Sequence, residues 1–260
     1  LREGIDEVTL GLEGRITPLI EAADMQGMIH VHSTWSDGRH SIRELAECVR
    51  GRGYRYLLIT DHSKAAFYAN GLDERRLADQ GREIDALNRD FDPSEFTILK
   101  GIECDILADG ELDLADDALA ALDAVIVSIH SRFELPREAQ TDRIIRALEH
   151  PATTILGHPT GRLLLGRKGY EIDHQRVIDA AAHLGKAIEI NANPRRLDLS
   201  WRMLRHAVSM GVRIAISPDA HTISHFDYMP YGIVIGQKGG LTRELTLNAM
   251  TAEALRMKTS

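Results

Sequence analysis

Two histidines stand one residue apart in the stretch MIHVH, at residues 28–32. On a β-strand, side chains two residues apart point to the same side, about 6.5 Å from each other along the backbone. Two imidazoles at this spacing can bind one cation, with metal–nitrogen distances of about 2.0–2.1 Å for zinc. Asp219 and His221 repeat the same spacing near the other end of the chain. The pattern His30–Val31–His32 therefore predicts a metal-binding strand end.

Potential metal ligands also stand at the ends of most other apolar runs. The runs are rich in Ile, Val and Leu, as expected for strands buried on both faces of a parallel sheet. They occupy residues 28–32, 56–62, 97–104, 124–130, 153–158, 186–191 and 213–219. The ligand-type residues at or just after their ends are His30, His32, His62, Glu103, His130, His158, Asp219 and His221.

Asp37, in the loop STWSDG after the first run, is a further candidate ligand. An Asp-Gly pair alone indicates only a turn. This loop, however, begins at the predicted site, and the other candidates are mostly imidazoles. We therefore include Asp37 among the expected metal ligands.

Helical patterns separate the apolar runs. Residues 41–54, 73–90, 137–150, 173–185 and 199–211 carry apolar side chains at helical spacing. Ser41 followed by Glu44 predicts a capping box, and Gly185 and Gly211 stand where helices should end. This alternation without a linker predicts one α/β domain with a barrel-like sheet. An open doubly wound sheet is the alternative, but no Gly-rich dinucleotide loop follows the first run.

A parallel barrel would bring the candidate ligands together. All strand C-termini lie on one face of such a barrel, so residues far apart in the sequence meet there. A single buried histidine is more often a hydrogen-bonded core residue than a ligand. Burying six histidines and two carboxylates together without a cation would be very costly. We therefore predict a shared metal site at the C-terminal ends of the strands.

The composition argues against several other classes of protein. The 260 residues carry a formal net charge of −8, which argues against a nucleic-acid binder with a basic surface all round. Cys48 and Cys104 form no CxxC pair, so we expect neither a thiolate zinc site nor a disulfide scaffold, and we expect a cytoplasmic location. No apolar run approaches the roughly 20 residues that cross a bilayer, and the polar start is unlike a signal peptide. Residues 1–25, with a helical pattern at 14–24, should precede the barrel.

The motifs together resemble the polymerase and histidinol phosphatase (PHP) family of phosphoesterases. The segments HVHSTWSDG, ITDHS, KGIECDILADGELDL, SIHSRFELPRE, ILGHPTGRLLLGR, EINANPRRLDL and DAH are similar to the PHP domain at the C-terminus of bacterial family X DNA polymerases. The resemblance covers about residues 26–236. Two departures, QGMIHVH for GDLHVH and Ser in SPDAH for a common Thr, change no ligand. The resemblance implies a linker or preamble at 1–25, a PHP domain at 26–260 and a polymerase domain upstream in a longer protein.

The resemblance also implies a distorted (β/α)7 TIM-like barrel that holds three divalent ions, Zn²⁺ or Mn²⁺, with Fe²⁺ as a further candidate. The first ion would be held by His30, His32, Glu103 and Asp219. The second would be held by Asp37, His62 and His221, and the third by His130 and His158 with Glu103 bridging. Three such ions would change the formal charge to about −2, so the acidic composition does not exclude a phosphate substrate.

Such a cluster would hydrolyse phosphate esters by attack of a metal-bridged hydroxide on phosphorus. We expect Glu103, Asp219 and His221 to take part directly in catalysis. Polar residues after the strand ends could hold the phosphate or a DNA backbone: Lys64, Arg132, Arg162, Asn191, Asn193 and Arg195. For each cation, a solvated surface position is the alternative interpretation.

The resemblance implies DNA as the substrate, through 3′-5′ exonuclease activity and 3′-end or abasic-site processing in DNA repair. A small-molecule phosphatase of the histidinol-phosphatase type, acting on phosphate monoesters, is the first alternative. The amidohydrolase superfamily also uses HxH barrels, but it usually has a metal-bridging Lys where this chain has Glu103 or His130. A non-catalytic PHP scaffold of a polymerase is the last alternative, and such relatives typically lose ligands.

Overall fold

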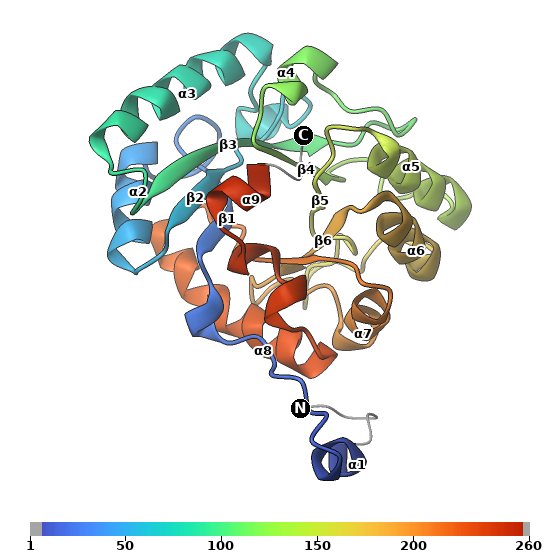
Figure 1. Cartoon of the computed structure of the whole chain (residues 1–260). Helices are drawn as coiled ribbons and strands as arrows, with labels where there is room; N and C mark the ends of the chain where they lie inside the picture. Colours follow the sequence, from blue (N-terminus) through green and yellow to red (C-terminus); the bar gives the residue numbers. More distant parts are fainter. Residues whose placement is uncertain (1–6, 257–260) are drawn as a thin grey trace.

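The computed structural model describes residues 7–256 and contains a sheet of seven parallel strands in sequential order. The sheet forms a nearly closed barrel with helices around it (Figure 1). The strands are β1 Gly27–Val31, β2 Tyr56–Ile59, β3 Thr97–Asp105, β4 Ala124–Ser128, β5 Ile155–Leu156, β6 Ala187–Asn191 and β7 Ile214–Ser217. Beyond β7, the Ala220 N–H donates to the carbonyl of His30 at 3.0 Å, and the His32 N–H donates to Ala220 at 2.8 Å. The predicted barrel is confirmed, and the open-sheet alternative is wrong.

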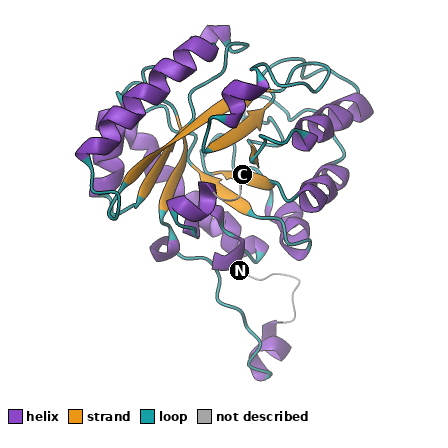
Figure 2. Cartoon of the chain, turned by 45° about the horizontal axis from the view of Figure 1, so that its top comes forward, coloured by secondary structure: helices purple, strands orange, loops and turns teal. Residues whose placement is uncertain are grey.

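Helices cover the outside of the barrel (Figure 2). They are α2 Ile42–Gly51, α3 Glu74–Leu87, α4 Asp116–Ala120, α5 Arg137–Glu149, α6 His174–Leu184, α7 Trp201–Ser209 and α8 Met229–Gly239. The capping box of Ser41 and Glu44 is present at the start of α2. Gly185 ends α6 with a positive φ of 68°, a conformation in which glycine has no Cβ penalty. Among the helices of residues 7–256, none combines the length and the apolar character needed to cross a bilayer.

The N-terminal segment joins the barrel at Ile20, which is fully buried and donates its N–H to Leu241 at 3.0 Å. Before it, α1 (Glu7–Leu12) lies apart from the barrel (Figure 1). The helix expected at 14–24 is absent except for one 3₁₀ turn, Ala22–Asp24, because Pro18 supplies no N–H in the middle of the stretch. The predicted domain boundary at residue 25 stays a prediction, and residues 1–6 and 257–260 lie outside the described part.

The barrel interior is apolar at one end and polar at the other. Its apolar half contains Ile29, Tyr56, Leu58, Leu99, Ala124, Ile126, Ile155, Ala187 and Ala215, and Leu247 and Leu255 of the C-terminal segment pack against it. Leu255 belongs to α9 (Ala252–Arg256). Further along the strands, the two-residue alternation brings polar side chains to the same inward positions, as in Leu99–Gly101–Glu103 and Ala187–Glu189–Asn191. The sequence therefore builds a packed floor beneath a polar upper end.

The close approach of β1 and β2 at this floor gives a testable prediction. A methyl group added at Gly27 would overlap the ring of Tyr56, which is fully buried. We expect Gly27→Ala to lower the free energy of unfolding by about 1–3 kcal/mol, because the packed floor cannot move aside. Denaturant unfolding measures this change.

Gly51→Ala is the matched control, because nothing lies within 4 Å of its added methyl group at the end of α2. Alanine is also the better helix former, so this variant should lose no stability. Equal stabilities of the two variants would contradict the packing described here.

Candidate metal centre

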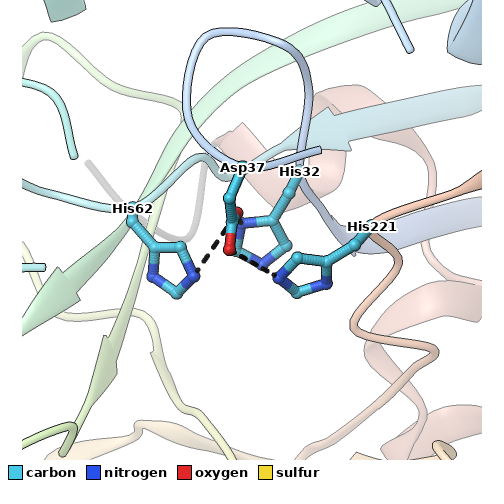
Figure 3. A group of neighbouring side chains, drawn as sticks. All are labelled: His32, Asp37, His62 and His221. Carbon is cyan, nitrogen blue, oxygen red and sulfur yellow. Dashed lines mark ion pairs between the residues drawn. The ribbon is translucent and has the colours of Figure 1, made fainter. Parts of the chain in front are cut away.

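The structure brings all nine candidate metal ligands together at the C-terminal ends of the strands. They form four overlapping groups in which one ligand atom from each residue lies within 4.8 Å of the others. The groups are His32, Asp37, His62 and His221; His30, His32 and Asp219; His30, Glu103 and His158; and His62, Glu103 and His130. Figure 3 shows the first group, in which the Asp37 carboxylate lies between the rings of His62 and His221. Residues at or after the ends of six of the seven strands thus share one site.

The carboxylate of Glu103 lies at the centre of the cluster. Its Oε1 is 2.8 Å from His158 Nε2 and 3.3 Å from His130 Nε2. Its Oε2 is 3.0 Å from His62 Nδ1, 3.3 Å from His30 Nε2 and 3.5 Å from His32 Nε2. The two oxygens therefore face different sets of imidazoles. Each oxygen could thus help to hold a cation together with the imidazoles that it faces.

Asp219 provides a second carboxylate on the other side of His32. Its Oδ1 lies 3.3 Å from His32 Nε2, 3.7 Å from His30 Nε2 and 3.7 Å from His221 Nδ1. His221 Nε2 is in turn 3.4 Å from Asp37 Oδ2. About a third of the Asp37 and His221 side chains is exposed, whereas His30 and His32 are fully buried. The cluster is therefore open to solvent on the Asp37 side.

Three of the nine residues have a backbone conformation that is rare for residues other than glycine. The φ angle is +64° at His30, +21° at His158 and +52° at Asp219. The register of β1 against β2 shifts between Met28 and Val31, so His30 lies in a bulge. Ile29 packs inside the barrel and Val31 packs outside it, so regular alternation would have turned His30 outward. Such backbone strain costs about 1–3 kcal/mol per residue and is typical of functional sites.

The cluster keeps its carboxylates ionised and the imidazole of His32 neutral. Burial would raise the pKa values of Glu103 and Asp219, but His30 and the other nearby imidazoles outweigh burial and hold both well below their usual range. Burial, with the charges of two neighbouring imidazoles, lowers the pKa of His32 to about 3. Ionised carboxylates and neutral imidazoles are the forms that bind metals.

Several buried polar atoms at the centre have no hydrogen-bond partner. They are His30 Nε2, both ring nitrogens of His32, His62 Nδ1 and Glu103 Oε2. His30 Nε2, His32 Nε2 and His62 Nδ1 lie 3.0–3.5 Å from Glu103 Oε2, but without the geometry of a hydrogen bond. A buried polar atom without a partner costs about 1–3 kcal/mol. Bound divalent cations would satisfy these atoms, and mixed imidazole and carboxylate donors suit zinc and manganese.

Glu189 is a buried carboxylate next to the cluster that the sequence analysis did not identify. Its Oε1 lies 2.5 Å from His30 Nδ1, and its Oε2 accepts the backbone N–H of His158 at 2.6 Å. A carboxylate behind a ligand histidine fixes the tautomer and the orientation of the ring. The sequence did contain a signal, because Glu189 lies two residues before Asn191 and thus on the same side of β6.

Two further acidic residues were not identified from the sequence. Asp105, two residues after Glu103, lies 3.2 Å from His130 Nδ1. Asp61, next to His62, accepts the backbone N–H of Ser33 at 2.8 Å and its hydroxyl at 2.6 Å. Asp61 also accepts hydrogen bonds from Ser36 and Gln80. It therefore anchors the loop that carries Asp37.

The predicted phosphate-binding residues differ in their distance from the cluster. Asn191 is in contact with it, because its Nδ2 donates to Asp219 Oδ2 at 3.1 Å. Asn193 instead accepts the backbone N–H of Arg195 at 3.0 Å, and Arg195 itself is exposed.

The other three predicted cations have protein partners. Lys64 pairs with Glu74 at 2.6 Å on the surface, and Arg132 lies 3.9 Å from Glu134. Arg162 donates from its Nε to the carbonyl of residue 196 at 2.8 Å.

Arg196 is a cation in direct contact with a candidate ligand, whereas its neighbour Arg195 was the residue predicted from the sequence. Its Nε lies 3.4 Å from Asp219 Oδ2, and its side chain is only 16% exposed. Burial would lower the pKa of Arg196, but Asp219 and the other surrounding carboxylates raise it. This guanidinium is therefore held beside the cluster in its charged form.

Comparison with known proteins gives relatives of two kinds. The chain is 48% identical over 231 residues to the DNA polymerase/3′-5′ exonuclease PolX of Bacillus subtilis, which covers 89% of this chain but 40% of the length of that protein. It is 31% identical over 216 residues to a protein of Thermoanaerobacter sp. named as a probable phosphatase, covering 75% of this chain and 85% of that protein. No family model matches the chain.

A solved structure has a similar fold. It is the histidinol phosphate phosphatase of Lactococcus lactis in complex with zinc, L-histidinol and phosphate. The TM-score is 0.62 and the identity 18%, over 84% of this chain and 94% of that chain. The likeness extends to the barrel as a whole.

The contact between Glu189 and His30 predicts the behaviour of a variant. Glu189→Gln keeps the side-chain shape but removes the charge that holds the His30 ring. We expect the affinity for Zn²⁺ or Mn²⁺ to fall by about 10–100-fold. Calorimetric titration of the metal-free protein measures this affinity.

Glu47→Gln is the control, because Glu47 lies exposed on α2. It should bind the metals as the unchanged protein does. Equal affinities for the Glu189 and Glu47 variants, both folded by circular dichroism, would show that Glu189 does not orient a ligand.

Proposed function

Because the chain belongs to the PHP family, we propose that it is a metal-dependent phosphoesterase that hydrolyses DNA from the 3′ end. The activity would comprise 3′-5′ exonuclease cleavage and 3′-end or abasic-site processing in DNA repair. The observation that carries this proposal is the cluster of imidazoles and carboxylates in four overlapping groups, in each of which the ligand atoms lie within 4.8 Å of one another.

The choice of DNA rests on the relatives and on local charge. The identity to PolX is 48%, against 31% for the probable phosphatase. Residues 160–169 and 193–196, which follow β5 and β6, contain no acidic residue and five cations: Arg162, Arg167, Lys168, Arg195 and Arg196. In a chain with a net charge of −8, this local excess of positive charge favours a polyanionic substrate.

Divalent ions at this site would supply Lewis-acid stabilisation of phosphate oxygens and a hydroxide nucleophile near neutral pH. Glu103 would be shared between ions, as its two oxygens face different imidazoles. Asp37 and His221 lie on the exposed side, where a phosphate can approach. Arg196 can donate to a phosphate oxygen next to Asp219 and offset the charge that develops there.

Ser33 and Ser63, which are neighbours of the candidate ligands His32 and His62, use their hydroxyls for structural hydrogen bonds. The Ser33 hydroxyl donates to the Asp61 carboxylate at 2.6 Å. The Ser63 hydroxyl accepts the backbone N–H of Asp105 at 2.9 Å. Both hydroxyls hold backbone segments in place, and direct hydrolysis agrees with this.

A polymerase domain upstream of this chain and a cytoplasmic location complete the proposal. The chain spans 40% of the length of PolX, which leaves room for further domains in a longer protein. Cys48 and Cys104 are both free thiols, in keeping with a reducing compartment.

A phosphatase for small phosphate monoesters is the second candidate. Its support is the probable phosphatase of Thermoanaerobacter, of which the chain covers 85%. The non-catalytic scaffold has less support, because a ligand-type side chain stands at each of the nine candidate positions and the nine side chains converge.

The test compares a 5′-labelled single-stranded oligonucleotide with histidinol phosphate as substrates. We expect shortening of the oligonucleotide from its 3′ end in Mn²⁺ or Zn²⁺ and none in excess chelator. Glu103→Gln should lower the rate on the order of 100-fold or more, because it would weaken the binding of every ion that Glu103 helps to hold. Asp116→Asn, on a 91% exposed side chain, is the matched control and should retain the rate.

Turnover of histidinol phosphate alone would favour the small-molecule phosphatase. Absence of metal-dependent hydrolysis of either substrate, with metals bound, would favour the scaffold.

A further inference from the structure

Two consecutive aromatic side chains are exposed in the loop that follows β2. Phe67 is 85% exposed and Tyr68 65% exposed. They lie in one 3₁₀ turn, Phe67–Ala69, with their ring centroids 6.1 Å apart. Within residues 7–256, no segment packs over these two rings and removes them from solvent. Large aromatic surfaces kept in water mark a site for a partner or a ligand.

The loop that carries these rings is firmly tied to the metal centre. The Leu72 N–H donates to the carbonyl of His62 at 2.7 Å, so the segment leaves and returns beside a candidate ligand. Within it, the Ala66 N–H donates to Ser63 at 3.0 Å, and Asn70 Nδ2 donates to the carbonyl of Trp35 at 3.0 Å. The exposed rings are therefore presented on a hydrogen-bonded frame.

The position of the aromatic pair follows from the base of its loop, which is hydrogen-bonded to His62, a candidate ligand. Partial burial, with the charges of Asp105, Glu103 and Asp37, raises the pKa of Tyr68 to about 12, in keeping with this position. The aromatic pair therefore lies beside the metal centre.

The cationic loops after β5 and β6 lie across the barrel mouth from this pair, because the strands follow one another in sequence order around the barrel. Arg196 lies against Asp219. The Arg167 guanidinium is 4.1 Å from the ring centroid of Phe133 and donates to the carbonyl of Gly161 at 2.9 Å. One side of the mouth therefore presents π-faces, and the other presents fixed positive charge.

We propose that Phe67 and Tyr68 form a stacking platform for the bases next to the 3′ end of a single-stranded nucleic acid, whose phosphates the five cations across the mouth attract. This inference rests on the proposed function and adds the residues that would make the site selective for nucleotides with bases. Aromatic platforms combined with a positively charged groove are how proteins bind single strands without reading their sequence. A small monoester would gain little from rings placed at the rim.

The test measures selectivity between two matched substrates. One is a single-stranded oligonucleotide, and the other is the same oligonucleotide with its last two 3′ nucleotides replaced by base-free tetrahydrofuran units. For the Phe67→Ala/Tyr68→Ala double variant, we expect the kcat/KM ratio of normal to base-free substrate to fall by about 10–100-fold, through KM. The conservative variants Phe67→Trp and Tyr68→Phe should keep the ratio of the unchanged protein, because both retain an aromatic ring.

A binding measurement avoids dependence on turnover. An oligonucleotide with 2-aminopurine as its 3′-terminal base should show stacking-dependent quenching with the unchanged protein and lose it with the double variant. Met210→Ala is the control, since Met210 is 47% exposed but follows α7 at the opposite end of the barrel. This control should preserve both the ratio and the quenching.

An unchanged selectivity ratio and unchanged quenching in the double variant, while the unchanged protein degrades the oligonucleotide, would overturn the platform and leave the proposed function standing. If the unchanged protein neither binds nor hydrolyses single-stranded DNA, the proposed function fails and the platform fails with it.

Discussion

The arrangement of the whole molecule depends on one buried carboxylate. Glu103 is fully buried and lies within 3.5 Å of ring nitrogens from five histidines. Removing an ionised carboxylate from water costs several kcal/mol even after the protein relaxes. The surrounding imidazoles offset part of this cost, but Glu103 Oε2 and several of their ring nitrogens have no hydrogen-bond partner. Divalent cations bound by these donors would resolve the imbalance, because each ion would satisfy nitrogen and oxygen atoms at once.

The apolar parts of the barrel supply the stability that offsets the cost of burying these polar groups. Its lower half is packed with Ile, Leu, Ala and Tyr side chains, and the C-terminal segment packs against that half through Leu247 and Leu255. The outer core between strands and helices is larger and almost wholly apolar. Stability is thus supplied away from the site, which allows positive φ angles at His30, His158 and Asp219. The strain and the polar cluster occur in the same part of the fold.

Much of this organisation follows from the sequence by simple rules. Short, nearly continuous apolar runs predicted the strands, and apolar residues at helical spacing predicted the helices. The shared face of a parallel barrel accounts for the meeting of His30, Glu103 and Asp219. The capping box at Ser41 and the glycine end of α6 are local signals that tertiary contacts did not override.

Other features were beyond those rules. The bulge at His30 depends on pairing of β1 with its neighbours, which alternation within one strand does not encode. Glu189 stands in the middle of an apolar run, and its role becomes visible only when the fold brings His30 of β1 next to it. The choice between Arg195 and Arg196 depends on the loop path, since only Arg196 folds back on Asp219. The direction of a loop side chain cannot be predicted from the sequence, because loop residues follow no regular period.

Anomalous diffraction from crystals of the protein grown with Zn²⁺ or Mn²⁺ tests the central claim most directly. The account predicts up to three anomalous peaks around Glu103, each about 2.0–2.2 Å from imidazole or carboxylate atoms of the nine residues. The account would be contradicted by crystals that show only imidazoles and water around Glu103, with no anomalous peak at the absorption edge of the metal. The protein would then also retain no metal in solution.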